Sequence, residues 1–412
     1  MYMTKLSSIA DYVTDKISSN DIALREYVTT DCILQNKKGR EIATNLPPQS
    51  CCLTRYQHGD VLIANIRPYL KKVWFADIDG GASSDVLVFR AKEGHSPSFL
   101  YAVLLQDSFF DYVMQGAKGS KMPRGDKEQI LRYEMPTLSC SEESIGTFFL
   151  NLDQKIRLNE QINQNLEAMA KQLYDYWFVQ FDFPDENGRP YKSSGGEMVW
   201  NEKLKRKIPA SWENKNIEDI ADVYNGATPS TINEQNYGGD IVWITPKDLS
   251  DQKQKFVYQG ERNISQAGYN SCSTHLLPPN TILMSSRAPI GLLSIAKTEL
   301  CTNQGFKSFV PKAENISTYL YYYLNIHIKQ IEQLGTGTTF KEVSREDVLK
   351  FPILKPSDAI LDLWEKQVSA LNNKQFVIQK ENEFLTKQRD ELLPLLMNGQ
   401  VSVNSDLSVY KK

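Results

Sequence analysis

The chain has 412 residues, of which 41% are hydrophobic and 10% aromatic, which excludes a wholly disordered protein and favours at least two folded domains. Its formal net charge of −3 does not indicate a nucleic-acid binder, although an acidic protein can still carry a local basic surface. The sequence has no leader-like start and no apolar stretch of membrane-spanning length, which predicts a cytoplasmic protein. Its cysteines are neither paired nor spaced as metal ligands, which predicts reduced thiols and no metal centre.

Residues 1–140 are predicted to form a compact α/β domain. Short β-type runs at residues 61–66 and 86–89 alternate with short helices and with turns rich in glycine and proline. Residues 141–182 are predicted to form one long helix, because apolar residues recur at alternating spacings of four and three over more than four heptads. Its expected pairing positions are Leu152, Asn163, Leu166 and Leu173.

The same order of elements then follows a second time. Residues 183–210, rich in proline, glycine, serine and charge, are predicted to be a linker between the two halves. Residues 211–356 have the pattern of a second α/β domain, and residues 357–398 carry a second heptad pattern, followed by a loosely held tail at 399–412. The expected pairing positions of the second helix are Leu371, Asn382, Leu385 and Leu392.

The two halves are interpreted as copies of one unit. Similar residues recur in the same order at an offset of about 220 residues, which isolated chance matches would not do. The repeat predicts two similar domains and two similar long helices, related by an approximate twofold axis. Matching pairs include Arg67 and Arg287, Phe89 and Phe309, Lys92 and Lys312, and Tyr101 and Tyr321.

The two helices are expected to pair as an antiparallel coiled coil that separates the domains. Asn163 and Asn382 fall at equivalent heptad positions, where a buried polar residue lowers stability but fixes the register of two strands. The alternative is that each helix packs only on its own domain. Since DNA has local twofold symmetry, two domains arranged in this way suit a protein that contacts two half-sites along a duplex.

Motifs of known catalytic chemistry are missing from the sequence. Residues 116–121 have the composition of a phosphate-binding loop but not its spacing, and neither a dinucleotide-binding glycine pattern nor a His-Glu-x-x-His motif occurs. The Pro-Pro pairs at 47–48 and 278–279 lack the preceding Asn or Asp and the following aromatic residue of amino-methylating enzymes. We therefore expect no catalytic residue, no metal and no cofactor bound by this chain.

Polar and basic loops late in each domain are the candidate DNA contacts. In the first domain, the glycine-rich segment 116–132 and the end of an apolar strand supply side chains that can bind phosphate oxygens or, for arginine, guanine. The second domain has a corresponding segment at 335–341 and an Asn-Gln pair of the kind that hydrogen-bonds adenine edges. The alternative for each is a solvated surface loop, and the recurrence of glycine with lysine or arginine in both copies favours DNA. The candidates are Arg67, Lys71, Lys72, Lys118, Ser120, Lys121 and Arg124 in the first domain, and Arg287, Asn303, Gln304, Thr338, Thr339, Lys341 and Arg345 in the second.

One stretch of the second domain resembles a known family. Residues 226–230 (Gly-Ala-Thr-Pro-Ser) and 237–249, which include Trp-Ile-Thr-Pro, are similar to the target-recognition domain of specificity subunits from Type I restriction–modification systems. The similarity continues through Arg-Ala-Pro-Ile-Gly at 287–291 and Asn-Gln-Gly-Phe at 303–306. The order of domains and helices resembles the layout of that family over essentially the whole chain.

The resemblance implies a non-catalytic subunit that recognises a DNA target in two parts, one per domain. Its implied partners are double-stranded DNA, two methyltransferase subunits docked on the helices, and motor-nuclease restriction subunits, with S-adenosylmethionine bound by the methyltransferases. The first domain lacks counterparts of Gly-x-Thr-Pro-Ser and Trp-Ile-x-Pro, which implies a different half-site and hence a non-palindromic target. The alternatives are a self-contained modification or restriction enzyme and a coiled-coil adaptor that binds only proteins.

Overall fold

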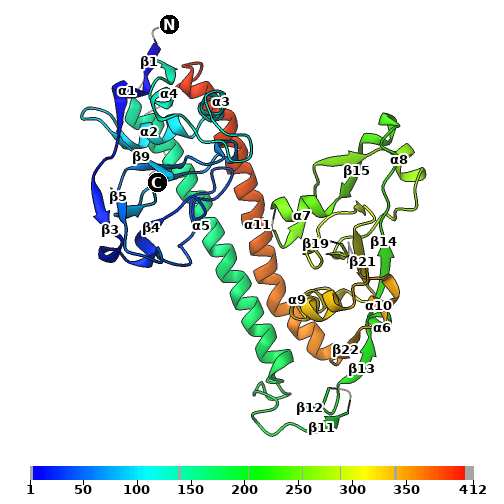
Figure 1. The fold of residues 1–412 in the computed structure, drawn as a ribbon. Helices are drawn as coiled ribbons and strands as arrows, with labels where there is room; N and C mark the ends of the chain where they lie inside the picture. The colour runs from blue at the N-terminus through cyan, green and yellow to red at the C-terminus, as the bar shows by residue number, and fades with distance from the viewer. Residues whose placement is uncertain are drawn as a thin grey trace, which may run out of the picture. The chain divides into compact units, whose positions relative to one another are not determined.

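The computed structural model describes residues 3–137, 141–202, 204–252, 254–287, 289–337 and 341–403, and it divides into two compact units (Figure 1). Unit 1 comprises Met1–Gln161 with Lys380–Lys412, and unit 2 comprises Ile162–Gln379. The division falls inside both long helices, so each unit contains one sheet-centred domain and a part of each helix. Within the described ranges no helix is both long enough and apolar enough to cross a membrane.

The domain of unit 1 is built on a four-stranded antiparallel sheet in the order β2-β9-β6-β7. A second sheet has the order β3-β5-β8-β4, and β1 pairs with β10. The strands are β1 (Met3–Lys5), β2 (Ala10–Tyr12), β3 (Lys16–Ser18), β4 (Tyr27–Val28), β5 (Cys52–Tyr56), β6 (Val61–Ala64), β7 (Val73–Phe75), β8 (Gly80–Ala82), β9 (Val86–Ala91) and β10 (Glu134–Pro136). The helices are α1 (Leu6–Ile9), α2 (Pro97–Leu104), α3 (Asp107–Gln115) and α4 (Lys127–Ile130), with a 3₁₀ turn, η3, at Pro68–Leu70.

The domain of unit 2 is built on a five-stranded sheet in the order β14-β21-β18-β19-β16. A smaller sheet has the order β17-β15-β20, while β13 pairs with β22 and β11 with β12. The strands are β11 (Met198–Asn201), β12 (Arg206–Pro209), β13 (Glu213–Asn216), β14 (Ala221–Asn225), β15 (Tyr237–Ile244), β16 (Phe256–Val257), β17 (Arg262–Ile264), β18 (Ile282–Ser285), β19 (Leu293–Ala296), β20 (Cys301–Thr302), β21 (Phe306–Pro311) and β22 (Pro352–Lys355). The helices are α6 (Ile217–Ile220), α7 (Pro246–Gln252), α8 (Gln266–Asn270), α9 (Ser317–Gln333) and α10 (Arg345–Leu349).

Corresponding strands occupy the same places in the two central sheets. The order β2-β9-β6-β7 matches β14-β21-β18-β19, and the registers agree because Val61 pairs with Phe75 and Phe89 as Ile282 pairs with Ile295 and Phe309. This shared topology agrees with the repeat in the sequence.

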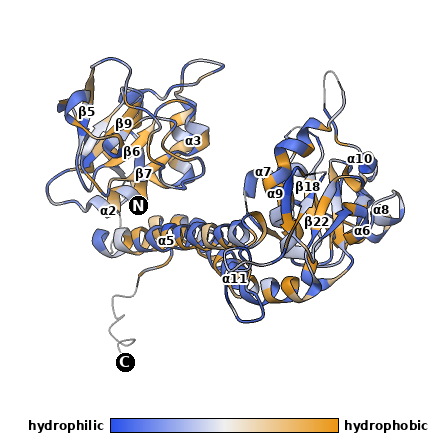
Figure 2. Cartoon of the chain, turned by 90° about the horizontal axis from the view of Figure 1, so that it is seen from below, coloured by the Kyte–Doolittle hydropathy of each residue, from blue (hydrophilic) through white to orange (hydrophobic). Residues whose placement is uncertain are grey.

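The central strand of each sheet is buried on both faces, which explains its uninterrupted apolar sequence. In β6, Val61 and Ile63 pack in the core that contains α2, while Leu62 packs on the opposite face with Trp74 and Tyr56. The central strand β18 is likewise fully buried. Figure 2 shows hydrophobic stretches along the central strands of each domain. A strand of this kind ends in a fixed position, which makes its last residues a rigid support for polar loops.

The two long helices are α5 (Glu142–Tyr174), which continues as a π-helical turn at Asp175–Val179, and α11 (Asp358–Met397). They are antiparallel where they meet within each unit. In unit 1, Asp153 and Asn159 of α5 contact Arg389 and Asn382 of α11, respectively. In unit 2, Trp177 of the π-helical turn that continues α5 packs on Trp364 of α11. The antiparallel pairing expected from the heptads is therefore confirmed.

The residues that fill the contact between these helices differ from those expected. The six predicted leucines Leu152, Leu166, Leu173, Leu371, Leu385 and Leu392 are only partly buried. Asn382 donates to the backbone oxygen of Ile156 and accepts from the amide of Asn159, at 2.8 Å, so its partner is Asn159 and not the heptad-equivalent Asn163. In an antiparallel pair, a twofold axis relates equivalent positions, but equivalent residues do not in general contact each other. A residue further along one helix faces a residue earlier in the other helix.

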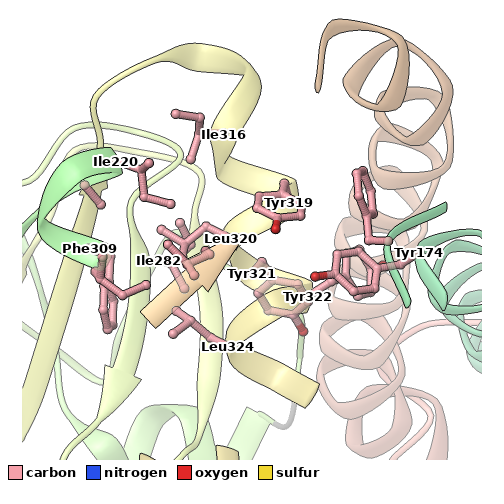
Figure 3. Close-up of a cluster of buried hydrophobic side chains, with 14 of the residues drawn as sticks. Tyr174, Ile220, Ile282, Phe309, Ile316, Tyr319, Leu320, Tyr321, Tyr322 and Leu324 are labelled. Carbon is pink, nitrogen blue, oxygen red and sulfur yellow. The ribbon is translucent and has the colours of Figure 1, made fainter. Parts of the chain in front are cut away.

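Aromatic residues join the long helices to the domain of unit 2. Figure 3 shows Tyr319 and Tyr322 of α9 on the side of Tyr174 of α5, and their ring centroids lie 5.9 and 5.5 Å from that of Tyr174. On the other side of α9, Leu320 and Leu324 belong to the same core as the sheet residues. The segment 183–210, expected to be a linker, carries the β11–β12 hairpin and buries Phe183 and Ile208 in this core.

Candidate nucleic-acid interface

In each unit, a pair of backbone hydrogen bonds joins two residues on either side of a glycine-containing segment, and in unit 1 this segment folds into a short hairpin. In unit 1 the hairpin spans residues 118–124 and closes with Lys118 N–H to Arg124 O and the reciprocal bond, at 3.0 and 2.9 Å. In unit 2 the same two bonds join Thr336 and Glu342, both at 3.0 Å. Gly119 and Gly337 have φ values of 98° and 119°, a conformation that glycine adopts without strain.

In both units the residue after this bonded pair is tied to the carboxyl end of the central strand. In unit 1, Gly125 N–H donates to Asn65 O at 3.3 Å, and Asn65 N–H donates to Asp85 O at 2.9 Å. In unit 2, Val343 N–H donates to Ser286 O at 3.1 Å, and Ser286 N–H donates to Gly305 O at 2.8 Å. Each unit therefore brings together the same three segments: the strand end, the segment closed by the bonded pair, and the turn that leads into β9 or β21.

The structure of unit 1 gathers most of the predicted basic residues on this surface. Arg67 follows the strand end in a left-handed conformation, with φ of 53°, and its N–H donates to Pro123 O of the hairpin at 2.8 Å. Arg124 forms an ion pair with Asp85 at 3.2 Å, although its side chain remains 59% exposed. The exposed members of this surface are Arg67, Lys118, Ser120, Lys121 and Arg124.

Two of the predicted residues in unit 1 have structural partners instead. Lys71 forms an ion pair with Asp107 of α3 at 3.0 Å, which ties the turn after η3 to that helix. Lys72 donates to the backbone oxygen of Thr30 at 2.6 Å, and burial lowers the pKa of its ammonium group. A contact of either lysine with DNA would have to replace or share these interactions.

The predicted residues of unit 2 lie around the same strand end. Arg287 forms an ion pair with Glu342 at 3.0 Å. Lys341, the residue before Glu342 in the sequence, is exposed. Arg345 donates from Nε to the backbone oxygen of Val223 at 2.6 Å and so links α10 to β14. Thr338 and Thr339 lie outside the described residues.

The Asn-Gln pair is partly engaged within the protein. Asn303 Oδ1 accepts from Gly305 N–H at 2.9 Å, so a bidentate contact of Asn303 with adenine would require breaking this bond. Gln304 is exposed, and its side-chain oxygen accepts from the hydroxyl of Thr228. This bond turns the amide oxygen towards Thr228 and leaves the amide N–H groups as the outward donors of Gln304.

Sequence reasoning missed two features of this surface. Lys307 and Glu342 join Arg287 in one cluster, with Lys307 Nζ 3.3 Å from Glu342 Oε1. The second feature is the counterpart of Trp-Ile-Thr-Pro in unit 1: Tyr27–Val28 pairs in parallel with β8 as Trp243–Ile244 pairs with β20. The two dipeptides share an aromatic and a β-branched residue, a signal too short to detect without the strand register.

Across the part of the chain that the structure describes, no three His, Cys, Asp or Glu side chains are grouped as metal ligands. The described residues of the candidate site offer hydrogen-bond donors, amides and paired charges. Such an arrangement can bind a polyanion and contact the edges of bases.

Comparison with known proteins shows which proteins this chain is similar to. Residues 209–383 match the family model described as the Type I restriction modification DNA specificity domain. The MjaIX specificity subunit of Methanocaldococcus jannaschii is 38% identical over a segment covering 45% of this chain, and the chain spans 44% of that relative's length. The HindI specificity subunit of Haemophilus influenzae is 27% identical, over 96% of this chain and 98% of its own length.

The fold also matches a solved structure. A Type I restriction–modification S subunit from M. genitalium superposes with a TM-score of 0.61 over 98% of this chain and 96% of its own, at 14% identity. The strand order repeated in both units, the antiparallel helices and the named relatives all agree. The chain is thus similar to specificity subunits of Type I restriction–modification systems, in residues 209–383 by the family model and over nearly its whole length by the HindI relative.

Proposed function

We propose that this chain is the DNA-recognition subunit of a Type I restriction–modification complex and that each unit contacts one half of a split target. The observation that carries this proposal is the construction of one surface twice. In both units a backbone-bonded loop closure, a strand end and a turn meet through the same pattern of backbone hydrogen bonds and present arginine and lysine side chains. Phosphate contacts would position each domain, and base contacts would select the sequence.

The two surfaces differ in their side chains, which supports a non-palindromic target. Unit 1 presents Lys118 and Lys121 with Arg124, whereas unit 2 presents Gln304 and a cluster in which Glu342 replaces the arginine of the hairpin. Since the donor and acceptor patterns of the two surfaces differ, they suit different base pairs.

The proposed partners are supported by the similarity to specificity subunits and by the two long helices. Two methyltransferase subunits would dock on α5 and α11 and would bind S-adenosylmethionine themselves, while restriction subunits would add DNA cleavage. This chain would contribute recognition only.

Methylome sequencing tests the proposal. Cells that express this chain together with its genomically neighbouring methyltransferase should methylate adenine in one split, asymmetric sequence, and cells that express either protein alone should not. Turnover of S-adenosylmethionine by the purified chain alone would support a self-contained enzyme instead. Assembly with methyltransferase without salt-dependent DNA binding would support a protein-only adaptor.

A further inference from the structure

Three charged side chains of unit 2 form one continuous set of ion pairs at the candidate interface. Lys307 Nζ lies 3.3 Å from Glu342 Oε1, and Arg287 Nε and Nη2 both lie 3.0 Å from Glu342 Oε2. The Lys307 side chain is buried and 6% exposed, whereas the Arg287 side chain is 48% exposed. The carboxylate therefore has one cation on its buried side and one on its exposed side.

The buried lysine keeps the surface positive despite the carboxylate. Burial alone would raise the pKa of Glu342, but hydrogen bonds from Arg287 and Lys307 hold this pKa below its ordinary value, so the group is ionised. Two cations and one carboxylate leave one net positive charge. Glu342 can thus hold Arg287 in place without cancelling the attraction of this surface for DNA.

The contact with Glu342 also fixes the orientation of the Arg287 guanidinium. Its Nε edge points at the carboxylate, so the remaining N–H groups of the two Nη atoms face away from Glu342. Two parallel donors of this kind match O6 and N7 of guanine in the major groove. A surface carboxylate next to a phosphate would repel it, so the arrangement suits a base contact better than a phosphate contact.

We propose that Glu342 is a positioning residue that presents Arg287 to one guanine of the half-site contacted by unit 2, with Lys307 as its buried counter-charge. This inference rests on the proposed function. It assigns at least one G·C pair to that half-site and makes Arg287 the residue that selects it.

Unit 1 supports the same principle with different residues. Arg124, at the hairpin position that corresponds to Glu342, forms an ion pair with Asp85, which precedes β9. Strand register places Leu87 where unit 2 has Lys307, because Leu87 pairs with Ile63 as Lys307 pairs with Met284. Both units therefore hold one half-exposed arginine with one carboxylate at the same strand end, although the arginine comes from a different segment in each.

The test uses the full chain assembled with its methyltransferase subunits and short duplexes that carry the split target found by methylome sequencing. Each guanine of the unit 2 half-site is replaced in turn by 7-deazaguanine, and each G·C pair by A·T. The wild-type complex should lose about 5-fold to 100-fold in affinity when one particular G·C pair is replaced. The 7-deazaguanine at that same position should reproduce part of the loss, because it lacks the N7 acceptor.

Glu342→Gln and Arg287→Lys should remove discrimination at this single position and leave every position of the other half-site unchanged. Glu342→Gln keeps the shape but loses the charge that orients the guanidinium, and Arg287→Lys keeps the charge but loses the planar fork. The matched control is Glu346→Gln, which removes a carboxylate from an exposed residue of α10. Thermal unfolding checks each fold, and Arg287→Lys decides the question if Glu342→Gln does not fold.

The outcomes separate this inference from the proposed function. A wild-type complex that recognises a split target while neither variant changes discrimination at any guanine would overturn the positioning role. Uniform weakening on all sequences, with a smaller dependence of affinity on salt, would make Arg287 a phosphate contact instead. A wild-type complex with no split target would refute the proposed function itself.

Discussion

At the scale of single residues, a buried ion pair of unit 1 couples the two long helices. Arg389 of α11 lies 2.9 Å from Asp153 of α5, and their side chains are 4% and 6% exposed. The hydroxyl of Tyr101, from α2, donates to the same carboxylate. Replacing only one partner would leave the other as a buried charge without a counter-ion. The stability lost in this way is much larger than the stability that the intact pair adds over a pair of apolar residues.

We expect Arg389→Met to lower the free energy of unfolding of unit 1 by about 3–5 kcal/mol. Urea unfolding followed by circular dichroism measures this change. The matched control is Lys387→Met, on the same helix, which breaks an exposed pair with Glu391 and should change stability by less than about 0.5 kcal/mol. Equal effects of the two substitutions would show that Arg389 and Asp153 are solvated in solution.

His327 provides a prediction for pH dependence in unit 2. Burial lowers the pKa of its imidazole below the ordinary value of about 6.5, although a hydrogen bond to the backbone oxygen of Tyr323 opposes this shift. The unfolded state therefore binds more protons than the folded state, and stability should fall as the pH drops from about 6.5 through the folded pKa. His327→Gln should flatten this part of the pH profile of unit 2 unfolding, whereas His275→Gln, at an exposed position, should not. An unchanged profile in His327→Gln would show that other groups cause any acid destabilisation.

Sequence reasoning located the basic side of the candidate site but not its acidic partners. Arg67, Lys121 and Arg124 were predictable because basic residues next to glycine, after an apolar strand, are typical of phosphate-binding loops. Glu342 was not predictable, because a single acidic residue disfavours contact with the negatively charged DNA backbone. The structure shows that Lys307, from strand β21, lies beside Glu342 and offsets its charge. This pairing depends on a contact across 35 positions of the chain, which no local pattern encodes.

At the scale of elements, the heptad pattern predicted both long helices but not which residues face each other. Asn159 is buried, and its amide donates to Asn382 Oδ1 and to Glu381 Oε2, both at 2.8 Å. The strict heptad leucines remain partly exposed, because other helix residues are buried against the domains and the partner helix. The heptad periodicity of the sequence indicates which stripe of a helix is the most apolar. The stripe that is buried in this structure also includes amide side chains and an ion pair.

The Asn159–Asn382 contact predicts a non-additive pair of substitutions. Asn382→Leu alone should destabilise unit 1 by about 1–3 kcal/mol, because the buried Asn159 amide loses an acceptor. The double variant Asn159→Leu, Asn382→Leu should recover most of this loss, since two apolar residues replace the hydrogen bond. A double-mutant cycle on urea unfolding measures the coupling, and strictly additive effects would mean that the two amides do not interact.

At the scale of the whole molecule, the sequence repeat predicted the most. Two sheets with the same strand order follow from two sets of strands with the same spacing, and an antiparallel helix pair follows from two equivalent heptad patterns. What the repeat could not supply is the boundary between units. That boundary depends on which helix half packs on which domain, and it falls inside both helices, at Gln161–Ile162 and Gln379–Lys380.

If each unit contacts one half of a split target, as proposed, the length of the two helices should determine the spacer between the half-sites, because both helices run through both units. In an antiparallel pair, an insertion must be made in both helices to keep the register, between residues 159 and 163 and between 378 and 382. One added heptad, at ~1.5 Å per residue, adds roughly 10 Å, or about three base pairs at ~3.4 Å each.

Those three base pairs also rotate the groove by about 100°, whereas a coiled coil with a pitch near 150 Å turns only about 25° over the same rise. The domains would therefore meet the lengthened spacer out of phase. We expect methylation of a longer spacer with weakened binding, or loss of methylation where the rotation is not absorbed by DNA twist. Methylome sequencing of cells with the doubly extended chain measures the outcome, and a single insertion in α11 serves as the control that disrupts the register. Full methylation of the original spacer by the doubly extended chain would show that the helices do not set the distance between half-sites.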